Sequence, residues 1–224
     1  MEICTRFSAL LQSLGATHNL SQFYSIAFLQ HHTEPQQHYH TLKHVDSMLA
    51  SLDDHKSAIS NPTAVELAIY LHDWVYNPQA TTNEAESVDA FRQLANKVPD
   101  IDEKLTERVV NLIDATLSHG VGPDILADEV EDMKYFLDFD LAFVGSNGLD
   151  YAHSAGYIRK EHSYLSDQEY LDHRIPLLKS HLERERLYLS DHFFTKYETQ
   201  ARFNIGEELW FLGQGEIAWA FAPK

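Results

Sequence analysis

Four pairs of residues in this sequence combine metal-binding or proton-binding side chains with a suggestive spacing or an apolar setting. They are His40 and His44, His72 and Asp73, Thr116 and His119, and Asp138 and Asp140. His40 and His44 lie four residues apart, which places two side chains on the same edge of a helix. His72 and Asp73 lie near the end of residues 64–76, a run that is apolar at almost every position. Such a run predicts a helix buried on all sides.

Burial of the His72-Asp73 pair is unfavourable by several kcal/mol unless the pair is compensated. A bound cation provides that compensation, with the imidazole neutral and the carboxylate ionised. Asp138 and Asp140 pose the same problem, because residues 136–145 are otherwise apolar. Imidazole and carboxylate ligands suit a divalent Mn, Fe, Ni, Zn or Mg ion, and the single cysteine, Cys4, excludes a thiolate site.

Each of these residues also has an ordinary alternative. A lone histidine such as His40 or His44 is commonly a surface or hydrogen-bonded side chain, Asp138 suits a helix end that faces water, and His119 before Gly120 suits a helix C-terminus. The other histidines, His31 and His32 among them, lie on polar segments and are expected at the surface. The combination favours a site: a histidine, a His-Asp pair and then a buried aspartate.

The elements expected to position these residues are all helices. Apolar residues recur with helical spacing, and neither two-residue alternation nor a hairpin turn occurs. Asn61-Pro62 predicts the start of the helix that carries His72, and Asn77-Pro78 predicts its end. Further expected boundaries are Gly15, a cap at Ser21, a start near Tyr39, a cap at Asn83 with Glu86, a start at Asp100 or Asp102, an end at Gly120, and caps at Ser146 and at Ser166 with Glu169. We expect an all-α fold, with one domain over residues 1–224 and about nine or ten helices.

Composition restricts the class of partner. The formal net charge of −17 over 224 residues argues against a nucleic-acid polymer, since no basic stripe is present to neutralise phosphates. It also means that a small anionic substrate needs a local positive centre, such as a metal ion. No apolar run approaches the ~18 residues that span a membrane, and the start of the sequence does not read as a signal peptide. A cytoplasmic protein is expected, and a homo-oligomer is left open.

The order and spacing of His44, His72-Asp73 and Asp140 resemble the HD-domain superfamily of metal-dependent phosphohydrolases. The chain is also similar, over nearly its full length, to a bacterial branch of uncharacterised, predicted metal-dependent HD phosphohydrolases. The segments that carry this second resemblance are residues 39–44, 71–76, 83–87, 115–119, 137–141, 157–161 and 201–208. Departures from that branch are His162 in place of tyrosine and His173 in place of glycine before Arg174.

The resemblance implies an HD-type helical bundle in which His44, His72, Asp73 and Asp140 hold a divalent metal ion. The ion activates a water molecule for attack on a small phosphoester, with nucleotides among the candidates. Glu84 and His119 are the candidates for the general base. The candidates for substrate binding are His40, Lys43, Arg159, Arg174 and Arg202, with arginine best suited to a bidentate grip on phosphate.

Two alternatives stay open at this point. One is an HD-fold module that binds or senses a ligand without turning it over. The other is a di-iron HD oxygenase that uses His119, and Asp138 or His40, as further ligands; Asp73 is then its one clear bridging carboxylate. The native metal, the number of ions and the substrate are not determined by the sequence.

Overall fold

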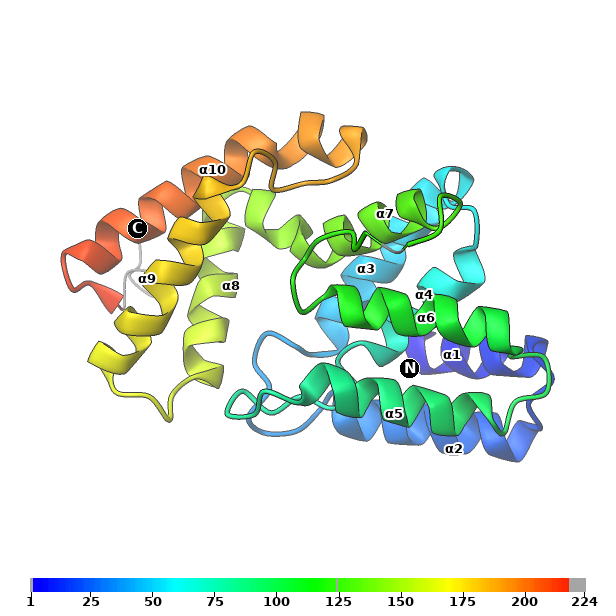
Figure 1. Ribbon diagram of the computed structural model, residues 1–224. Helices are drawn as coiled ribbons and strands as arrows, with labels where there is room; N and C mark the ends of the chain where they lie inside the picture. Colours follow the sequence, from blue (N-terminus) through cyan, green and yellow to red (C-terminus); the bar gives the residue numbers. More distant parts are fainter. Residues whose placement is uncertain (1, 124, 218–224) are drawn as a thin grey trace. The chain divides into compact units, whose positions relative to one another are not determined.

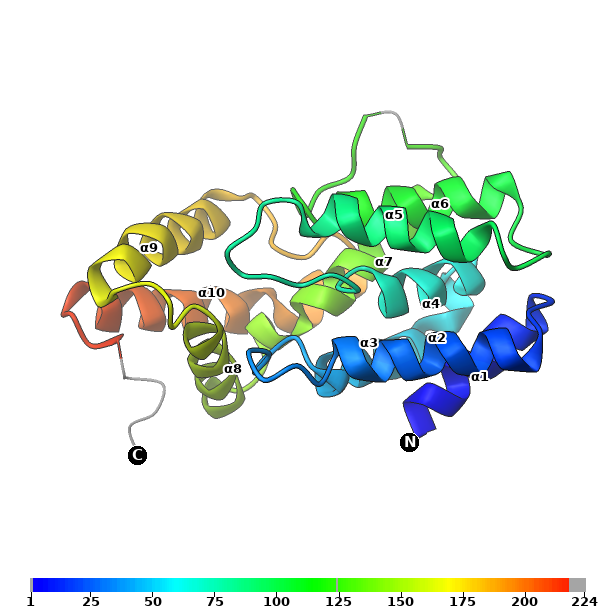
Figure 2. The same cartoon turned by 90° about the horizontal axis from the view of Figure 1, so that it is seen from below.

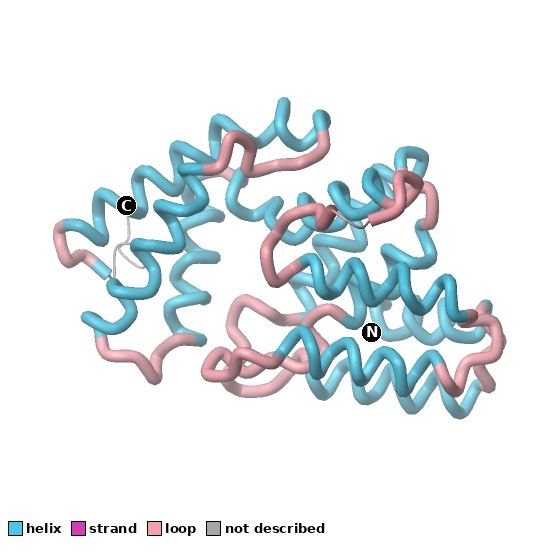
Figure 3. Tube along the Cα trace, in the orientation of Figure 1, coloured by secondary structure: helices cyan, strands magenta, loops and turns pink. Residues whose placement is uncertain are grey.

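The computed structural model describes residues 2–123 and 125–217, and helices joined by loops and turns make up that part of the chain (Figures 1 and 3). The described ranges contain ten α-helices, two short 3-10 helices and no strand, which confirms the all-α expectation there. None of these helices is both long and apolar enough to span a bilayer. The helices are α1 (Glu2–Ser13), α2 (His18–His31), α3 (Leu42–His55), α4 (Pro62–Leu71), α5 (Asn83–Ala95), α6 (Glu103–Ala115), α7 (Val130–Leu141), α8 (Gly148–Glu161), α9 (Asp167–Glu183) and α10 (Asp191–Gly213), with η1 (Lys56–Ala58) and η2 (Ala142–Gly145) between them.

The chain divides into two compact units, Met1–Leu137 and Asp138–Lys224. The division falls inside α7, so this one continuous helix begins in the first unit and ends in the second. The expectation of a single domain over residues 1–224 stays a prediction.

Helix α4 is the centre of the first unit. It packs against α3, α5 and α6, and Figure 2 shows it between α5 and α6 on one side and α1 to α3 on the other. Its residues Ala64, Val65 and Leu67–Leu71 are all buried, as the apolar run predicts. Tyr70 stacks on Phe7 of α1 with ring centroids 4.4 Å apart, and its hydroxyl donates to the Ile3 carbonyl. The helix that presents His72 is therefore enclosed on all sides.

Several expected helix boundaries are confirmed. The Asn61 side chain accepts a hydrogen bond from the Ala64 amide, with Pro62 in the first turn of α4. Asp102 caps α6. Ser166 and Glu169 form the expected capping box at the start of α9.

Other expected boundaries are wrong because a neighbouring residue caps the helix or the turn is tighter. Thr17 rather than Ser21 caps α2, since the buried Ser21 hydroxyl bonds to Ser8 instead. Helix α3 begins at Leu42 and not at Tyr39. Helix α4 already ends at Leu71, ahead of the expected stop at Asn77-Pro78.

The other wrong boundaries lie further along the chain. Thr82 precedes α5, because the Asn83 side chain binds the backbone of Asn77 and closes the 77–83 loop. Asn147 rather than Ser146 caps α8.

The second unit is organised around α10, which packs against α9 and η2. Asn204 of α10 is fully buried and donates to the carbonyls of Val144 and Ser146, each at 2.8 Å. Gly145 lies so close to α10 that an added Cβ would be 2.6 Å from the Cβ of Tyr197. Polar backbone contacts as well as apolar packing therefore hold this unit.

We predict that Asn61→Ala lowers the free energy of unfolding by about 1 kcal/mol, because the substitution removes the side-chain acceptor at the start of α4. Thr41→Ala is the matched control, since Thr41 is the N-cap of α3 but makes no side-chain capping bond. Urea unfolding followed by circular dichroism measures both changes. Equal losses in the two variants would contradict a specific role for the Asn61 cap.

Candidate metal centre

His72 is fixed at the C-terminal end of α4 by two hydrogen bonds. Its amide donates to the Ala68 carbonyl at 2.8 Å, and its Nδ1 lies 3.1 Å from the Ile69 carbonyl. A carbonyl only accepts, so Nδ1 carries a proton. The other ring nitrogen, Nε2, lies 3.0 Å from Oδ2 of Asp73. The helix end thus directs Nε2 of His72 toward the carboxylate of its neighbour.

Three of the four predicted metal ligands lie together. His44 of α3, His72 and Asp140 of α7 each offer one ligand atom, and these atoms are all within 4.8 Å of one another. The rings of His44 and His72 meet edge to face with centroids 5.6 Å apart. Asp140 lies in the last turn of α7. Both histidines are buried and Asp140 is half-buried.

Asp73 is the fourth predicted ligand and lies beside this group of three rather than within it. Burial acts to raise the pKa of its carboxyl, but the positive charge of protonated imidazoles at His72, His40 and His44, together with a hydrogen bond from His72, outweighs burial and holds that pKa well below its usual range. Asp73 is therefore an ionised carboxylate surrounded by imidazoles. Its assignment as a metal ligand stays a prediction.

His40 does not lie on α3, contrary to the expectation that it shares a helix edge with His44. It lies in the bend that precedes Leu42, where its ring stacks on Tyr76 with centroids 4.1 Å apart. The His40 and His44 rings are nevertheless 5.8 Å apart, because the bend folds back on the helix. Lys43, the neighbour of His44, is exposed.

Of the two candidates for the general base, one lies at the start of a helix and the other follows the end of a helix. Glu84 is half-buried in the first turn of α5. His119 follows α6, which ends at Ala115 rather than continuing to Gly120, so Thr116 and His119 do not share a helix face. His119 itself has a φ of 46°, in the left-handed region that the sequence suggested for glycine, and its amide closes the turn onto the Ala115 carbonyl. The catalytic roles of Glu84 and His119 stay predictions.

Asp138 is a buried structural residue, and the alternative that it faces water is wrong. Its carboxylate accepts hydrogen bonds from the Leu189 amide at 2.7 Å, the Ser190 amide at 2.8 Å and the Ser190 hydroxyl at 2.6 Å. Burial raises its pKa to about 6, against these three hydrogen bonds. Asp138 and Asp140 thus have different surroundings, although both interrupt the same apolar segment.

The three arginines predicted to bind substrate all make contacts inside the second unit. Arg174 forms a bidentate ion pair with Glu208, at 2.8 and 3.0 Å, and Glu208 also accepts a hydrogen bond from Tyr151. Arg159 donates to backbone carbonyls and to Asp167 and lies over the Tyr170 ring. Arg202 donates to Glu198 and to carbonyls at the end of α9 and in the loop that follows it. These contacts account for all three side chains, and their role toward a substrate stays a prediction.

His32 also belongs to this region, although its polar sequence context predicted a position at the surface. It is 2% exposed at the end of α2, and the charges of Asp73, His72 and His44 all act on its ring. The spacing of Tyr24, Phe28 and His32 is a signal that could have located it, because these residues recur at four-residue intervals on the buried stripe of α2.

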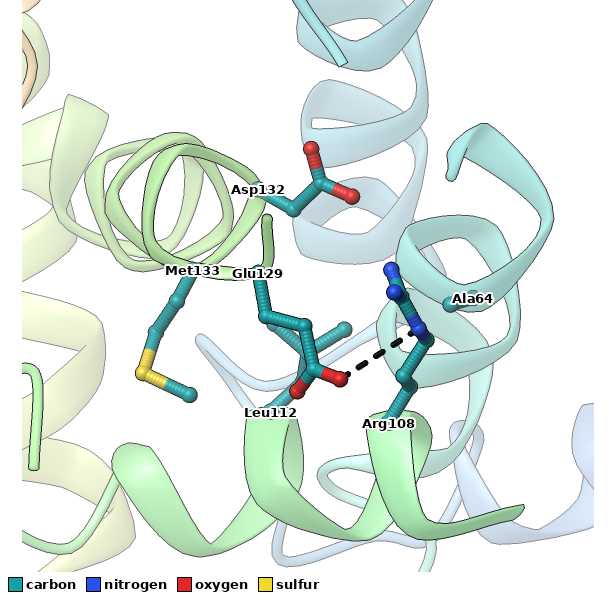
Figure 4. A pocket seen from close by; sticks show the side chains of 6 residues that line it. All are labelled: Ala64, Arg108, Leu112, Glu129, Asp132 and Met133. Atoms are coloured by element: carbon teal, nitrogen blue, oxygen red, sulfur yellow. Dashed lines mark ion pairs between the residues drawn. The ribbon is translucent and has the colours of Figure 1, made fainter. Parts of the chain in front are cut away.

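A small pocket in the first unit gathers charged side chains but satisfies them internally (Figure 4). Figure 4 shows Arg108 of α6 beside Glu129, with Nε and Oε1 3.3 Å apart. Arg108 also pairs with Asp128, and Asp132 accepts the amides of Ser60 and Asn61. These pairings tie the loop before α4 to α7, so the pocket has a structural explanation.

Comparison of the chain with protein-family models, with curated proteins and with solved structures gives no match. The resemblance to the HD-domain superfamily therefore stays a prediction that depends on the order and geometry of the residues themselves.

We predict that Asp138→Ala and Asp140→Ala affect stability differently. Removing the Asp138 carboxylate leaves two backbone amides and one hydroxyl without their acceptor. Each of these donors, where it is buried, then costs about 1–3 kcal/mol of folding free energy. The loss in unfolding free energy for Asp138→Ala should therefore be several kcal/mol, measured by urea denaturation. Asp140→Ala, at a half-buried position, is expected to change it by less than about 1 kcal/mol. A larger loss for Asp140→Ala than for Asp138→Ala would contradict this division of roles.

We predict that Arg174→Met destabilises the fold by about 3–5 kcal/mol, because it leaves the Glu208 carboxylate buried without its partner. Glu208 is 1% exposed. Arg92→Met is the control, since the Arg92–Glu107 pair is exposed and its loss is worth about 0–1 kcal/mol. Differential scanning calorimetry of the two variants measures the contrast. Retention of full stability by Arg174→Met would show that this pair is not structural.

Proposed function

We propose that the chain is a metal-dependent phosphohydrolase that acts on a small phosphoester. In this proposal His44, His72 and Asp140 hold a divalent ion, and Asp73 completes the protein ligands. The observation that supports the proposal is the convergence of one ligand atom each from His44, His72 and Asp140 within 4.8 Å. These three residues are 28 and 68 positions apart in sequence, so their meeting reflects the fold rather than local spacing.

The chemistry of the donors fits a divalent ion. Nδ1 of His72 faces the Ile69 carbonyl and Nε2 faces the Asp73 carboxylate at 3.0 Å, so both neighbours of the ring are acceptors. Either a second ring proton or a cation bound by both groups balances this arrangement. Nitrogen and carboxylate donors together suit Mn, Fe, Ni, Zn or Mg.

A divalent ion at this position supplies a Lewis acid that lowers the pKa of bound water and offsets charge on a phosphate. The residues of the chain then have distinct tasks. Asp73 stays ionised among its imidazoles and so keeps its charge for the ion. Glu84, half-buried in the helix that follows the 77–83 loop, is the proposed general base. His119 is the second candidate for that task.

Substrate contacts in this proposal come from the segment before and within α3. Lys43 is exposed next to His44 and can approach a phosphate as a point charge. His40 lies between His44 and Tyr76 and provides a second polar contact at the same edge. Arg159, Arg174 and Arg202 are the less favoured candidates, because each already makes ion pairs and hydrogen bonds inside the second unit.

We predict that the protein binds a divalent ion and hydrolyses phosphoesters only when loaded. The assay uses Mn2+, Fe2+, Ni2+, Zn2+ or Mg2+ with a panel of p-nitrophenyl phosphate, bis-p-nitrophenyl phosphate and nucleotides. His72→Ala is expected to abolish both ion binding and hydrolysis, at least 100-fold in kcat/KM, because it removes the central ligand. His18→Ala, an exposed histidine at the start of α2, is the control and should match the unmodified protein.

The outcomes of this experiment separate the remaining functions. A protein that binds one ion but leaves the whole panel unchanged favours a binding or sensing module, and a thermal-shift screen with nucleotides then identifies the ligand. Two bound irons with a visible charge-transfer band favour the oxygenase. Absence of any ion binding, judged by calorimetry and elemental analysis, would overturn the proposal.

A further inference from the structure

His32 is a buried imidazole outside the predicted ligand set. It forms the C-cap of α2, and its ring packs on Phe28 with centroids 4.4 Å apart. The ring of the preceding residue, His31, lies 4.8 Å from the ring of Trp74, the residue that follows the His72-Asp73 pair. The end of α2 is therefore packed against the segment that carries two of the proposed metal ligands.

The protonation state of His32 follows from its contacts. Nδ1 lies 3.1 Å from the Phe28 carbonyl, which only accepts, so Nδ1 carries the proton. Burial lowers the pKa of His32 to about 4, although the charge of Asp73 acts in the opposite direction. At neutral pH the ring is therefore uncharged, and its Nε2 atom is a hydrogen-bond acceptor.

Nε2 of His32 is buried and has no hydrogen-bond partner among the described residues. A buried acceptor without a donor is unfavourable by about 1–3 kcal/mol. The neighbouring ring of His31 packs on Trp74, the residue after Asp73, so the end of α2 that carries His32 lies beside the His72-Asp73 pair. His32 does not belong to the group whose ligand atoms lie within 4.8 Å of one another, so it is not placed as a ligand with His44, His72 and Asp140. The remaining task for this lone pair is to accept a hydrogen bond from a molecule bound at that group.

We propose that His32 is a positioning residue whose Nε2 accepts a hydrogen bond from a water molecule of the ion's coordination shell. The inference rests on the proposed function, because it requires an ion at His44, His72 and Asp140. A water molecule that donates one O–H to His32 keeps its oxygen lone pairs for the ion. His32 then acts on the ion through that water and makes no bond to the ion itself. Outer-shell contacts of this kind are typically worth 10–100-fold in metal affinity.

Binding of Co2+ alone, without substrate, tests this role. The measurements are the Co2+ affinity by calorimetry and the visible absorption band of the bound ion, with the unfolding temperature of the metal-free protein as a check of the fold. His32→Phe keeps a ring against Phe28 but removes the acceptor, and we expect a loss of about 10-fold or more in affinity with a shifted band. His32→Gln places an amide oxygen near the position of Nε2 and should restore both. His18→Phe, the same change at the exposed start of α2, should leave both unchanged.

Each result decides the matter. Wild-type affinity and an unchanged band in a folded His32→Phe protein overturn the role of His32 while leaving the proposed function intact. Equal losses in His32→Phe and His32→Gln also overturn it, because they indicate packing rather than an acceptor. If His32→Phe does not fold, the comparison of His32→Gln with His32→Asn, whose shorter amide does not reach the Nε2 position, replaces it. Absence of Co2+ binding in the unmodified protein overturns both the proposed function and this inference.

Discussion

The end of α4 combines two requirements that are difficult to satisfy together: an apolar helix enclosed on every side and a His-Asp pair directly after it. The helix is enclosed because α1, α3, α5 and α6 surround it, and its last carbonyls fix the backbone and the Nδ1 tautomer of His72. Burial then makes any unpaired charge at this point unfavourable. The imidazoles of His40 and His44 act on Asp73 in the opposite direction to burial. They favour the ionised form of its carboxyl and so offset the cost of burying that charge.

The same constraint explains why histidines gather here. An imidazole can be buried neutral, with one nitrogen donating to a carbonyl of its own helix and the other left as an acceptor. In both His32 and His72, Nδ1 lies against a carbonyl of its own helix, that of Phe28 and that of Ile69 respectively. Nε2 of each ring is thereby directed away from its helix.

The sequence was sufficient to predict the helical class and the buried helix α4, because apolar spacing and the Asn61-Pro62 start are local signals. The types and order of His44, His72 and Asp140 also predicted that these residues lie near one another, and their ligand atoms do; that they form a metal site stays a prediction. Local signals do not choose between competing caps, so Thr17 and Asn147 were missed where Ser21 and Ser146 looked equally suitable. They also do not reveal what a buried charge meets across the fold, so the contacts of Asp138 with Ser190 and of Arg174 with Glu208 could not be predicted from the sequence.

The internal pairing of the arginines has a consequence for encounter kinetics. The chain carries 34 acidic against 17 basic side chains, and Arg6, Arg108, Arg174 and Arg202 are among the cations already matched to carboxylates. The long-range field is therefore negative, and it extends about 10 Å into 0.1 M salt. An approaching polyanion is repelled until it comes within reach of a local positive centre. Association of such a ligand should accelerate as ionic strength rises, the reverse of the electrostatic steering seen in proteins with basic clefts.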